Sequence, residues 1–300
     1  MASAKGIKKR RKVTQNIHKI TKTMGLIATT RLRLASQKLN GFQSYEAKAH
    51  EILAQLLQGC QRHPMLEQRP DSKTIVLFAI TSNRGLCGNY NMRMLDGIDR
   101  FGKEMTAQGK TVVTHLVGRK GIQHFKFHNI ELAQTYPQLS DQPAWDEIAP
   151  IAQSLIQLFE SKETAQVWLL YTRKFKVMRE QLFPIANVSG QSVVPAGSGH
   201  QPPQAAVAAN DQESWRYCYW PDTDQIVNRL LPLFVKAKLW EIFLHAAVSE
   251  QTARMLAMKT ATENAEEMIK QLTRQYNRAR QAQITQEILE ILSGAQIDKK

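Results

Sequence analysis

The chain has 300 residues, with 40 Lys and Arg against 26 Asp and Glu, which gives a formal net charge of +14. This charge predicts a strongly anionic partner such as nucleic acid, an acidic protein surface or a membrane face. The length allows one large domain or two smaller ones, and the longest apolar run, 75–80, is far shorter than the ~20 residues of a membrane span.

The cysteines and the N-terminus indicate the compartment. Cys60, Cys87 and Cys218 are scattered and match no metal-ligand spacing. The basic N-terminal stretch leads into no apolar segment of the kind found in secretory signals. We therefore expect a cytoplasmic protein without structural disulfides.

The N-terminal block, 3–59, contains no proline and predicts one helix roughly 80 Å long. Apolar residues follow the 3-4 spacing of a coiled-coil seam and then continue in a frame shifted by one residue. The first set is Ile17, Ile20, Met24 and Ile27, and the second is Ala28, Leu32, Ala35, Leu39, Phe42, Ala49, Leu53 and Leu56. Eleven Lys and Arg precede the first acid, Glu46. Such a run is often only a solvated face, but its self-repulsion favours a docking surface for acidic groups.

The middle of the chain alternates strand and helix patterns. Continuous apolar runs at 74–82, 110–118 and 165–172 predict buried parallel strands. Helical patterns lie between them, in 92–101, 121–127 and 146–160. This alternation predicts a small Rossmann-like, doubly wound α/β domain.

Two further segments complete that domain. The composition of 190–214 is rich in Gly, Pro, Ser, Gln and Ala and predicts a flexible loop. The alternating aromatics of 215–222 predict an edge strand. Asp222 or Asp224 could cap the last helix, which Pro232 would kink near its start.

No catalytic, cofactor or metal site is expected in this chain. The turn after the first strand has only two glycines, Gly85 and Gly88, and lacks the phosphate-binding fingerprints. No G-x-S-x-G or H-E-x-x-H motif occurs. Cys87 reads as a packing residue because no His is placed by the sequence to activate it.

The C-terminal block, 240–294, has no proline and no glycine before Gly294, and predicts a second helix roughly 80 Å long. Its 3-4 pattern runs through Leu239, Ile242, Ala246, Ser249, Ala253, Leu256 and Thr260. A basic row follows at Lys270, Arg274 and Arg278, and then an apolar end at Ile284, Ile288, Leu289, Ile291 and Leu292. The basic row and the apolar end predict a partner outside the chain.

The two terminal blocks have nearly equal lengths, so an antiparallel coiled coil would bury both stripes. Two separate amphipathic helices on one core are the alternative. The predicted organisation is an N-terminal coiled-coil helix over 1–62, an α/β domain over 73–220 and a C-terminal coiled-coil helix over 222–296.

Several motifs in the correct order give the chain a resemblance to the gamma subunit of F-type ATP synthases over nearly its whole length. They are QNIHKITKTMGLIATTRLR, TSNRGLCGNYN, GRKG at 118–121, YCYWPD at 217–222, SEQTARMLAMKTATENA and YNRARQAQITQEILEILSGA. The resemblance implies a non-catalytic rotor shaft that couples ion-driven rotation of a membrane ring, by protons or sodium, to ATP synthesis and hydrolysis. It also implies a peripheral position on the cytoplasmic face of the bacterial inner membrane.

The resemblance implies partners and contact residues as well. The partners would be three alpha and three beta subunits, the epsilon subunit and the membrane c-ring. Contacts to beta would come from Met24, Arg31, Arg33, Arg254, Arg280, Gln281, Thr285 and Glu287. Contacts to the ring and epsilon would come from Tyr217, Tyr219, Trp220 and Asp222.

This sequence departs from the family pattern at Gly25, Trp220 and Gln283, where Glu, Glu and Ser are usual. Such departures fit a divergent or paralogous bacterial enzyme. The charge also permits a different class of protein, a basic coiled-coil nucleic-acid binder, although no nucleic-acid-reading motif is present. An α/β nucleotide-binding enzyme is a further alternative.

Overall fold

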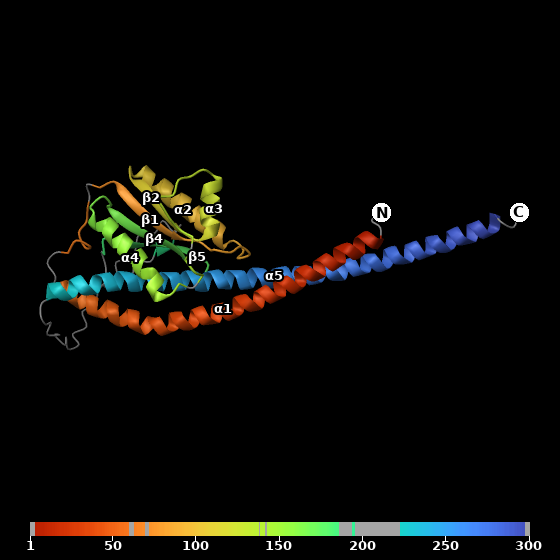
Figure 1. The fold of residues 1–300 in the computed structure, drawn as a ribbon, viewed down its shortest axis with the longest axis horizontal. Coiled ribbons are helices and arrows are strands. Elements are labelled where there is room, and N and C mark those ends of the chain that lie inside the picture. Colours follow the sequence, from red (N-terminus) through yellow and green to blue (C-terminus); the bar gives the residue numbers. More distant parts are fainter. Residues whose placement is uncertain are drawn as a thin grey trace. The chain divides into compact units, whose positions relative to one another are not determined.

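The computed structural model describes residues 4–59, 63–69, 72–137, 139–141, 143–185, 194–195 and 223–297 (Figure 1). Two long helices, α1 (Ala4–Gly59) and α5 (Thr223–Ile297), enclose the remaining elements in the sequence. Between them come β1 (Thr74–Ile80), α2 (Tyr90–Ala107), β2 (Thr111–Val117), α3 (Arg119–Phe127), β3 (Gln134–Tyr136), α4 (Trp145–Glu160), β4 (Gln166–Arg173), β5 (Lys176–Phe183) and β6 (Val194–Pro195).

The chain divides into two compact units, and each long helix contributes to both. Met1–Thr30 and Arg254–Lys300 form the first, which we call the two-helix unit. Arg31–Ala253 form the second, which we call the sheet unit. The predicted division at 1–62, 73–220 and 222–296 remains a prediction.

The sheet has six strands in the order β3-β2-β1-β4-β5-β6. The first four are parallel, with Phe78 of β1 opposite His115 of β2 and Leu169 of β4. β5 and β6 are antiparallel to their neighbours. β4 and β5 form a hairpin whose turn residues, Lys174 and Phe175, both have positive φ, as a type I′ turn requires.

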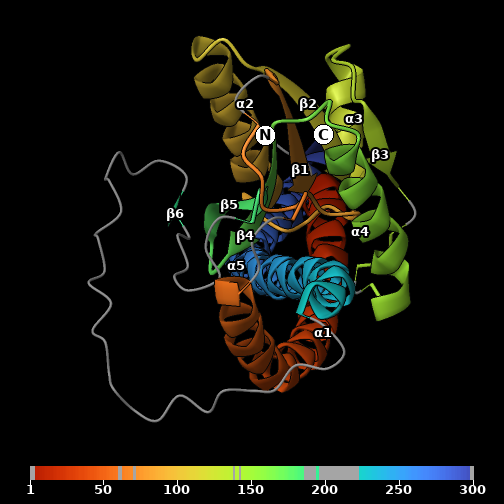
Figure 2. The same ribbon diagram turned by 90° about the vertical axis from the view of Figure 1, so that its left-hand side faces the viewer.

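Helices cover both faces of the sheet, and β1 and β4 are therefore buried on both sides. On one face, Val76 and Phe78 pack with α4, with the first part of α5 and with the end of α1. On the other face, Ile75 and Leu77 pack with α2 and α3. In the sheet unit, α5 lies between the sheet and α1 in both views (Figures 1 and 2). The predicted doubly wound domain is thus confirmed.

Within the sheet unit, the second part of α1 packs against the first part of α5. Leu39 and Phe42 of α1 form a cluster with Ala237 and Leu244 of α5. The ring of Phe42 meets the ring of Trp240 edge to face, with centroids 4.8 Å apart. The seam predicted from Ala28 to Leu56 is confirmed at its buried positions, which include Ala35, Leu53 and Leu56.

The sequence predictions differ from the structure in several places. The strands predicted at 74–82, 110–118 and 165–172 are β1, β2 and β4, whereas β3 and β5 were not predicted. α5 continues through Pro232 as one helix and begins at Thr223, so Asp224 lies inside it rather than capping it. The predicted loop at 190–214 and the predicted edge strand at 215–222 lie almost wholly outside the described residues.

Candidate interaction surfaces

The two-helix unit is an antiparallel pair with a narrow seam. Its buried α1 residues are spaced seven apart, at Ile7, Thr14, Thr21 and Ala28, and α5 contributes Met258 and Ala265. Thr262 Oγ1 donates to Thr21 Oγ1 at 2.9 Å, and Thr14 Oγ1 lies 3.7 Å from the Met268 sulfur. The Arg11 guanidinium lies over the Tyr276 ring at 5.1 Å. Small and polar seam residues allow the two helices to approach closely.

Part of the predicted seam of this unit was wrong. Ile17, Ile20 and Ile27 are 47%, 58% and 50% exposed, and Leu256 of α5 is 52% exposed. The buried residues of α1 in this unit repeat every seven positions instead, and three of the four, Thr14, Thr21 and Ala28, are small. The prediction assigned the bulky side chains to the seam, but they form a neighbouring stripe on the same helix.

That exposed stripe is the first candidate interaction surface, which we call the outer apolar stripe. On α1 of the two-helix unit it consists of Val13, Ile17, Ile20 and Ile27. Near the end of α5, Ile284, Ile288 and Leu289 are also exposed, by 43%, 51% and 58%. Exposed apolar residues gathered in this way mark an interaction site.

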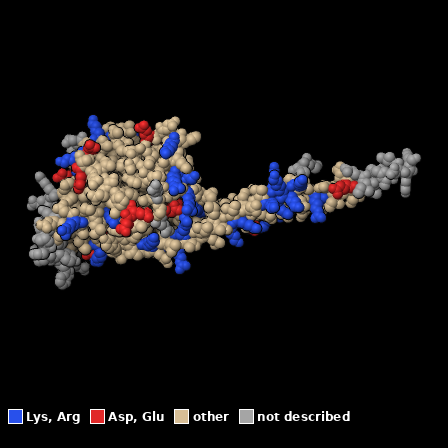
Figure 3. All heavy atoms as spheres, viewed as in Figure 1, with Lys and Arg blue, Asp and Glu red and all other residues tan. Residues whose placement is uncertain are grey.

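The two-helix unit is also basic, and on its visible face Lys and Arg side chains outnumber acids (Figure 3). α1 carries eight Lys and Arg and no acid up to Thr30, in the list Lys5, Lys8, Lys9, Arg10, Arg11, Lys12, Lys19 and Lys22. On α5, Lys270, Arg274 and Arg278 are exposed, and Lys270 pairs with Glu266 at 3.2 Å. The combined surface suits an anionic partner that also covers apolar groups.

The predicted beta-contact residues occupy different environments. Arg33, Arg280, Gln281, Thr285 and Glu287 are exposed on their helices, Met24 and Arg31 are half-buried, and Arg254 is only 6% exposed. Three of the exposed residues take part in hydrogen bonds along α5, where Thr285 Oγ1 donates to the Gln281 carbonyl at 2.9 Å and Gln283 donates to Glu287 at 2.9 Å. Tyr217, Tyr219, Trp220 and Asp222 lie outside the described residues.

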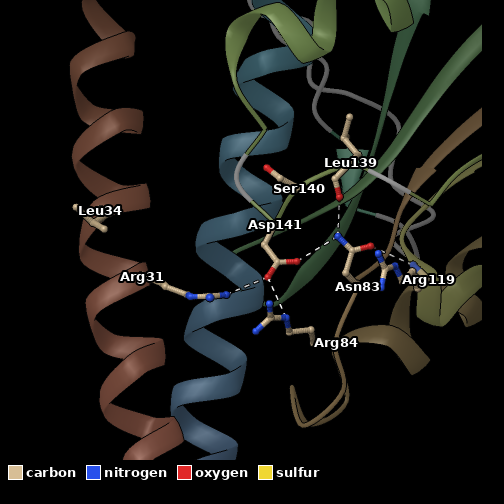
Figure 4. Close-up of a pocket in the computed structure, with 8 residues that line it drawn as sticks. All are labelled: Arg31, Leu34, Asn83, Arg84, Arg119, Leu139, Ser140 and Asp141. Carbon is tan, nitrogen blue, oxygen red and sulfur yellow. Dashed lines mark hydrogen bonds and ion pairs between the residues drawn. The ribbon is translucent and has the colours of Figure 1, made fainter.

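A second candidate surface is a pocket of about 520 Å³ in the sheet unit (Figure 4). It lies where β1 and β2 end, and α1 contributes one side. Its lining includes Arg31 of α1, Asn83 and Arg84 after β1, Arg119 at the start of α3, and Asp141. We call this the arginine pocket.

Asp141 is the hub of the arginine pocket. Its carboxylate accepts from Arg31 Nη1 at 3.0 Å and from Asn83 Nδ2 at 3.1 Å, and the Arg84 Nε lies 3.7 Å away. Asn83 also donates to the Leu139 carbonyl and accepts from the backbone N–H of Arg119. The asparagine therefore ties the loop after β1 to the segment that carries Asp141 and to the start of α3.

A buried ionic cluster lies between α1, β5 and α5 in the sheet unit. Lys238 Nζ lies 2.9 Å from both Glu180 and Glu241 and 3.6 Å from Glu46. Glu241 also lies 3.2 Å from His245 Nε2. Burial alone would lower the pKa of Lys238, but the two nearest carboxylates raise it above its ordinary value. Burial alone would raise the pKa of Glu241, but His245 and Lys238 hold it well below its ordinary value.

The part of the chain that the structure describes contains no group of three or more His, Cys, Asp or Glu able to hold a metal ion. Cys87 is buried in the turn after β1, 3.7 Å from Ser82 Oγ and 3.4 Å from Asn91 Nδ2, so it packs within a hydrogen-bonded turn. The sequence alone does not predict the arginine pocket or the Lys238 cluster. Their members come from segments far apart in the chain, and no local pattern joins them.

Comparison with known proteins shows the family to which this chain belongs. Residues 3–297 match the ATP synthase family (ATP-synt). The ATP synthase gamma chain of Rhodopirellula baltica is 36% identical over 299 residues, covering 99% of each chain. The chain belongs to the ATP synthase gamma-chain family. It is a gamma subunit, the central-stalk component of an F-type ATP synthase rotor, and a non-catalytic subunit of that complex.

Further relatives agree with this assignment. The gamma chain of Rubrobacter xylanophilus is 34% identical over 302 residues, covering 99% of this chain and 98% of the relative. Among solved structures, the rotor of Euglena gracilis mitochondrial ATP synthase shares the fold with a TM-score of 0.58 at 13% identity, covering 94% of this chain and 98% of that chain. The family assignment replaces the two alternative predictions, a nucleic-acid binder and a nucleotide-binding enzyme. No described helix is long and apolar enough to cross a membrane.

Proposed function

We propose that the two-helix unit turns inside a ring of three alpha and three beta subunits, while the sheet unit and the 217–222 segment contact the membrane c-ring and the epsilon subunit. In this proposal, ion flow turns the ring, the ring turns the gamma subunit, and the turning helices change the beta sites in succession. The complex acts on the cytoplasmic face of the bacterial inner membrane.

The observation that carries the proposal is the surface of the two-helix unit. On α1, Val13, Ile17, Ile20 and Ile27 face outward while the seam is mostly small, and the exposed charge on α1 up to Thr30 is entirely basic. An isolated two-helix pair would bury its bulky residues instead. The outer apolar stripe and the basic row are therefore complementary to a collar that is apolar in part and acidic in part.

One asymmetric shaft cannot contact three identical sites in the same way at once. Each orientation therefore stabilises a different conformation at each beta site, and rotation shifts their populations in turn. We assign the contacts to beta to Met24, Arg31, Arg33, Arg254, Arg280, Gln281, Thr285 and Glu287. Because Arg254 is buried in the chain, it acts by holding α5 in shape beside a contact rather than by reaching far outward.

Charge reversal at the exposed arginines tests these contacts. Arg33 and Arg280 are solvent-exposed, so R33E and R280E should leave the thermal stability of the chain within about 0.5 kcal/mol. In a reconstituted complex, both variants should lower ATP-driven ion pumping more than ATP hydrolysis. Arg100→Glu, on an exposed position of α2, is the matched control. Pumping by R33E and R280E that equals the control would refute the assigned contacts.

A further inference from the structure

The arginine pocket carries more positive charge than its own carboxylate balances. Arg31, Arg84 and Arg119 all line it, and Asp141 is the single acid among its eight lining residues. Lys120 follows Arg119, and its side chain reaches the turn at Gly85. The lining therefore has a net charge of about +2, from three guanidinium groups and one carboxylate.

The three arginines come from three different elements and line one pocket. In Figure 4, Arg31 and Arg84 point toward Asp141, and Arg119 lies on the other side of Asn83. α1 supplies Arg31, the loop after β1 supplies Arg84, and the start of α3 supplies Arg119. Arg31 is held by Asp141 at 3.0 Å, and Arg119 Nε donates to the Pro137 carbonyl at 3.3 Å. Arg31 and Arg119 thus each have an anchor that limits their movement, which lowers the entropy lost when a ligand binds.

The start of α3 does not offer its backbone N–H groups to an anion. The first N–H groups of α3 are occupied, because Asn83, the Ser82 carbonyl and Thr81 accept from Arg119, Lys120 and Gly121 respectively. The guanidinium groups are therefore the main donors that we assign to an anion in this pocket. Their planar forks match the oxygens of phosphate, to which they can donate paired hydrogen bonds.

The size and place of the pocket favour a small ligand. Its volume of about 520 Å³ falls within the range of small-molecule sites. It lies beyond the carboxyl ends of the parallel strands β1 and β2, the edge at which open α/β sheets bind ligands. We propose that the arginine pocket binds a small oxyanion of the phosphate class that carries at least two negative charges, through Arg31, Arg84 and Arg119.

Asp141 competes with the ligand in this site. An oxyanion would share Arg31 and Arg84 with the carboxylate, so Asp141 lowers the affinity while keeping the empty pocket in shape. The inference does not depend on the proposed contacts to other subunits, because the chain alone contains every group that it uses.

Titration calorimetry of the full-length chain with pyrophosphate tests the proposal. Wild type should bind one pyrophosphate per chain, with an affinity that falls as ionic strength rises. R119Q should weaken binding by about tenfold, corresponding to the loss of one charge-assisted contact. R100Q, which removes one exposed arginine outside the pocket, should bind as the wild type does. D141N should bind more tightly.

Two further measurements keep the outcome clear. Circular dichroism should show that R119Q and D141N retain the helical content of the wild type. A poly-glutamate peptide is titrated in parallel. No binding of pyrophosphate to the wild type, or equal affinities of R119Q and R100Q, would overturn the proposal. Binding of the peptide but not of pyrophosphate would overturn it too, because the pocket would then be a docking site for an acidic protein segment.

Discussion

Lys238 of α5 and Glu180 of β5 meet at 2.9 Å in the interior of the sheet unit, where their side chains are only 9% and 15% exposed. Glu241 lies equally close to the same Lys238 Nζ. The ionic cluster therefore ties the first part of α5 to the antiparallel edge of the sheet, and it contributes to how firmly the long helix is attached.

Replacing Lys238 with Met should destabilise the chain by about 3–5 kcal/mol, because Glu180 and Glu241 would remain buried without their cation. Urea unfolding followed by circular dichroism measures the change. Lys103→Met is the control, since Lys103 and Asp99 form an exposed pair on α2 that is worth about 0.3–0.5 kcal/mol. Equal effects of the two substitutions would show that the buried cluster contributes no more to stability than the exposed pair does.

Acid should weaken the same cluster. The pKa of Glu241 is lowered in the folded chain, so its contribution to stability is fully present above the unfolded-state pKa of about 4.3 and is lost as the pH falls through the folded-state value. Glu241→Gln should therefore be less stable than the wild type at neutral pH, and the difference should shrink as the pH falls below about 4.3. Unfolding free energies measured across this range test the sign.

The control for this pH dependence is Glu266→Gln, at an exposed position of α5 in the two-helix unit. Its stability difference from the wild type should stay within about 0.5 kcal/mol at every pH. A difference between wild type and Glu241→Gln that stays constant as the pH falls would contradict the assignment of the lowered pKa to this carboxyl group.

Two glycines should respond to alanine in opposite ways. At Gly41, in the middle of α1, an added Cβ meets nothing within 4 Å, so Gly41→Ala should stabilise the chain by about 0.5–1 kcal/mol through helix propensity. At Gly118, between β2 and α3, φ is +99° and a Cβ would clash with the Thr81 carbonyl. Gly118→Ala should therefore destabilise the chain by more than 1 kcal/mol. Thermal unfolding of both variants measures this contrast.

The sequence was sufficient to predict the elements in which one pattern of apolar residues dominated. The continuous apolar runs of β1, β2 and β4 identified buried strands, and proline-free stretches identified α1 and the part of α5 that follows Pro232. β5 was missed because its sequence, KVMREQLF, is charged and only partly buried, and because its hairpin turn is Lys174–Phe175 rather than a pair with Asn or Gly.

The surfaces were harder to predict than the fold. Periodicity found an apolar stripe on α1 but could not tell whether Ile17 and Ile20 or Thr14 and Thr21 face α5, since both sets repeat at helical spacing. The size of the side chains decides which set faces α5, because small residues let the helices approach. The arginine pocket depends on how Arg31, Arg84 and Arg119 come together in three dimensions, and no sequence window contains all three.

The outer apolar stripe should matter for assembly and not for folding. Ile20 is 58% exposed, so Ile20→Gln should change the unfolding free energy of the isolated chain by less than about 0.5 kcal/mol. If a collar of alpha and beta subunits covers Ile20, the same substitution removes apolar area from that contact and should lower the yield of assembled complex in reconstitution. Gel filtration of reconstituted mixtures gives the yield.

The matched control is Gln15→Ala, at an exposed position on the same helix that lies outside the stripe. It should assemble as the wild type does. Ala28→Gln provides the opposite case, because Ala28 is 1% exposed, and a polar side chain there should destabilise the chain itself. Full assembly of Ile20→Gln, with failure of Ala28→Gln alone, would contradict the prediction. Assembly would then depend only on the integrity of the helix pair, and the exposed residues of the stripe would have no role in the contact.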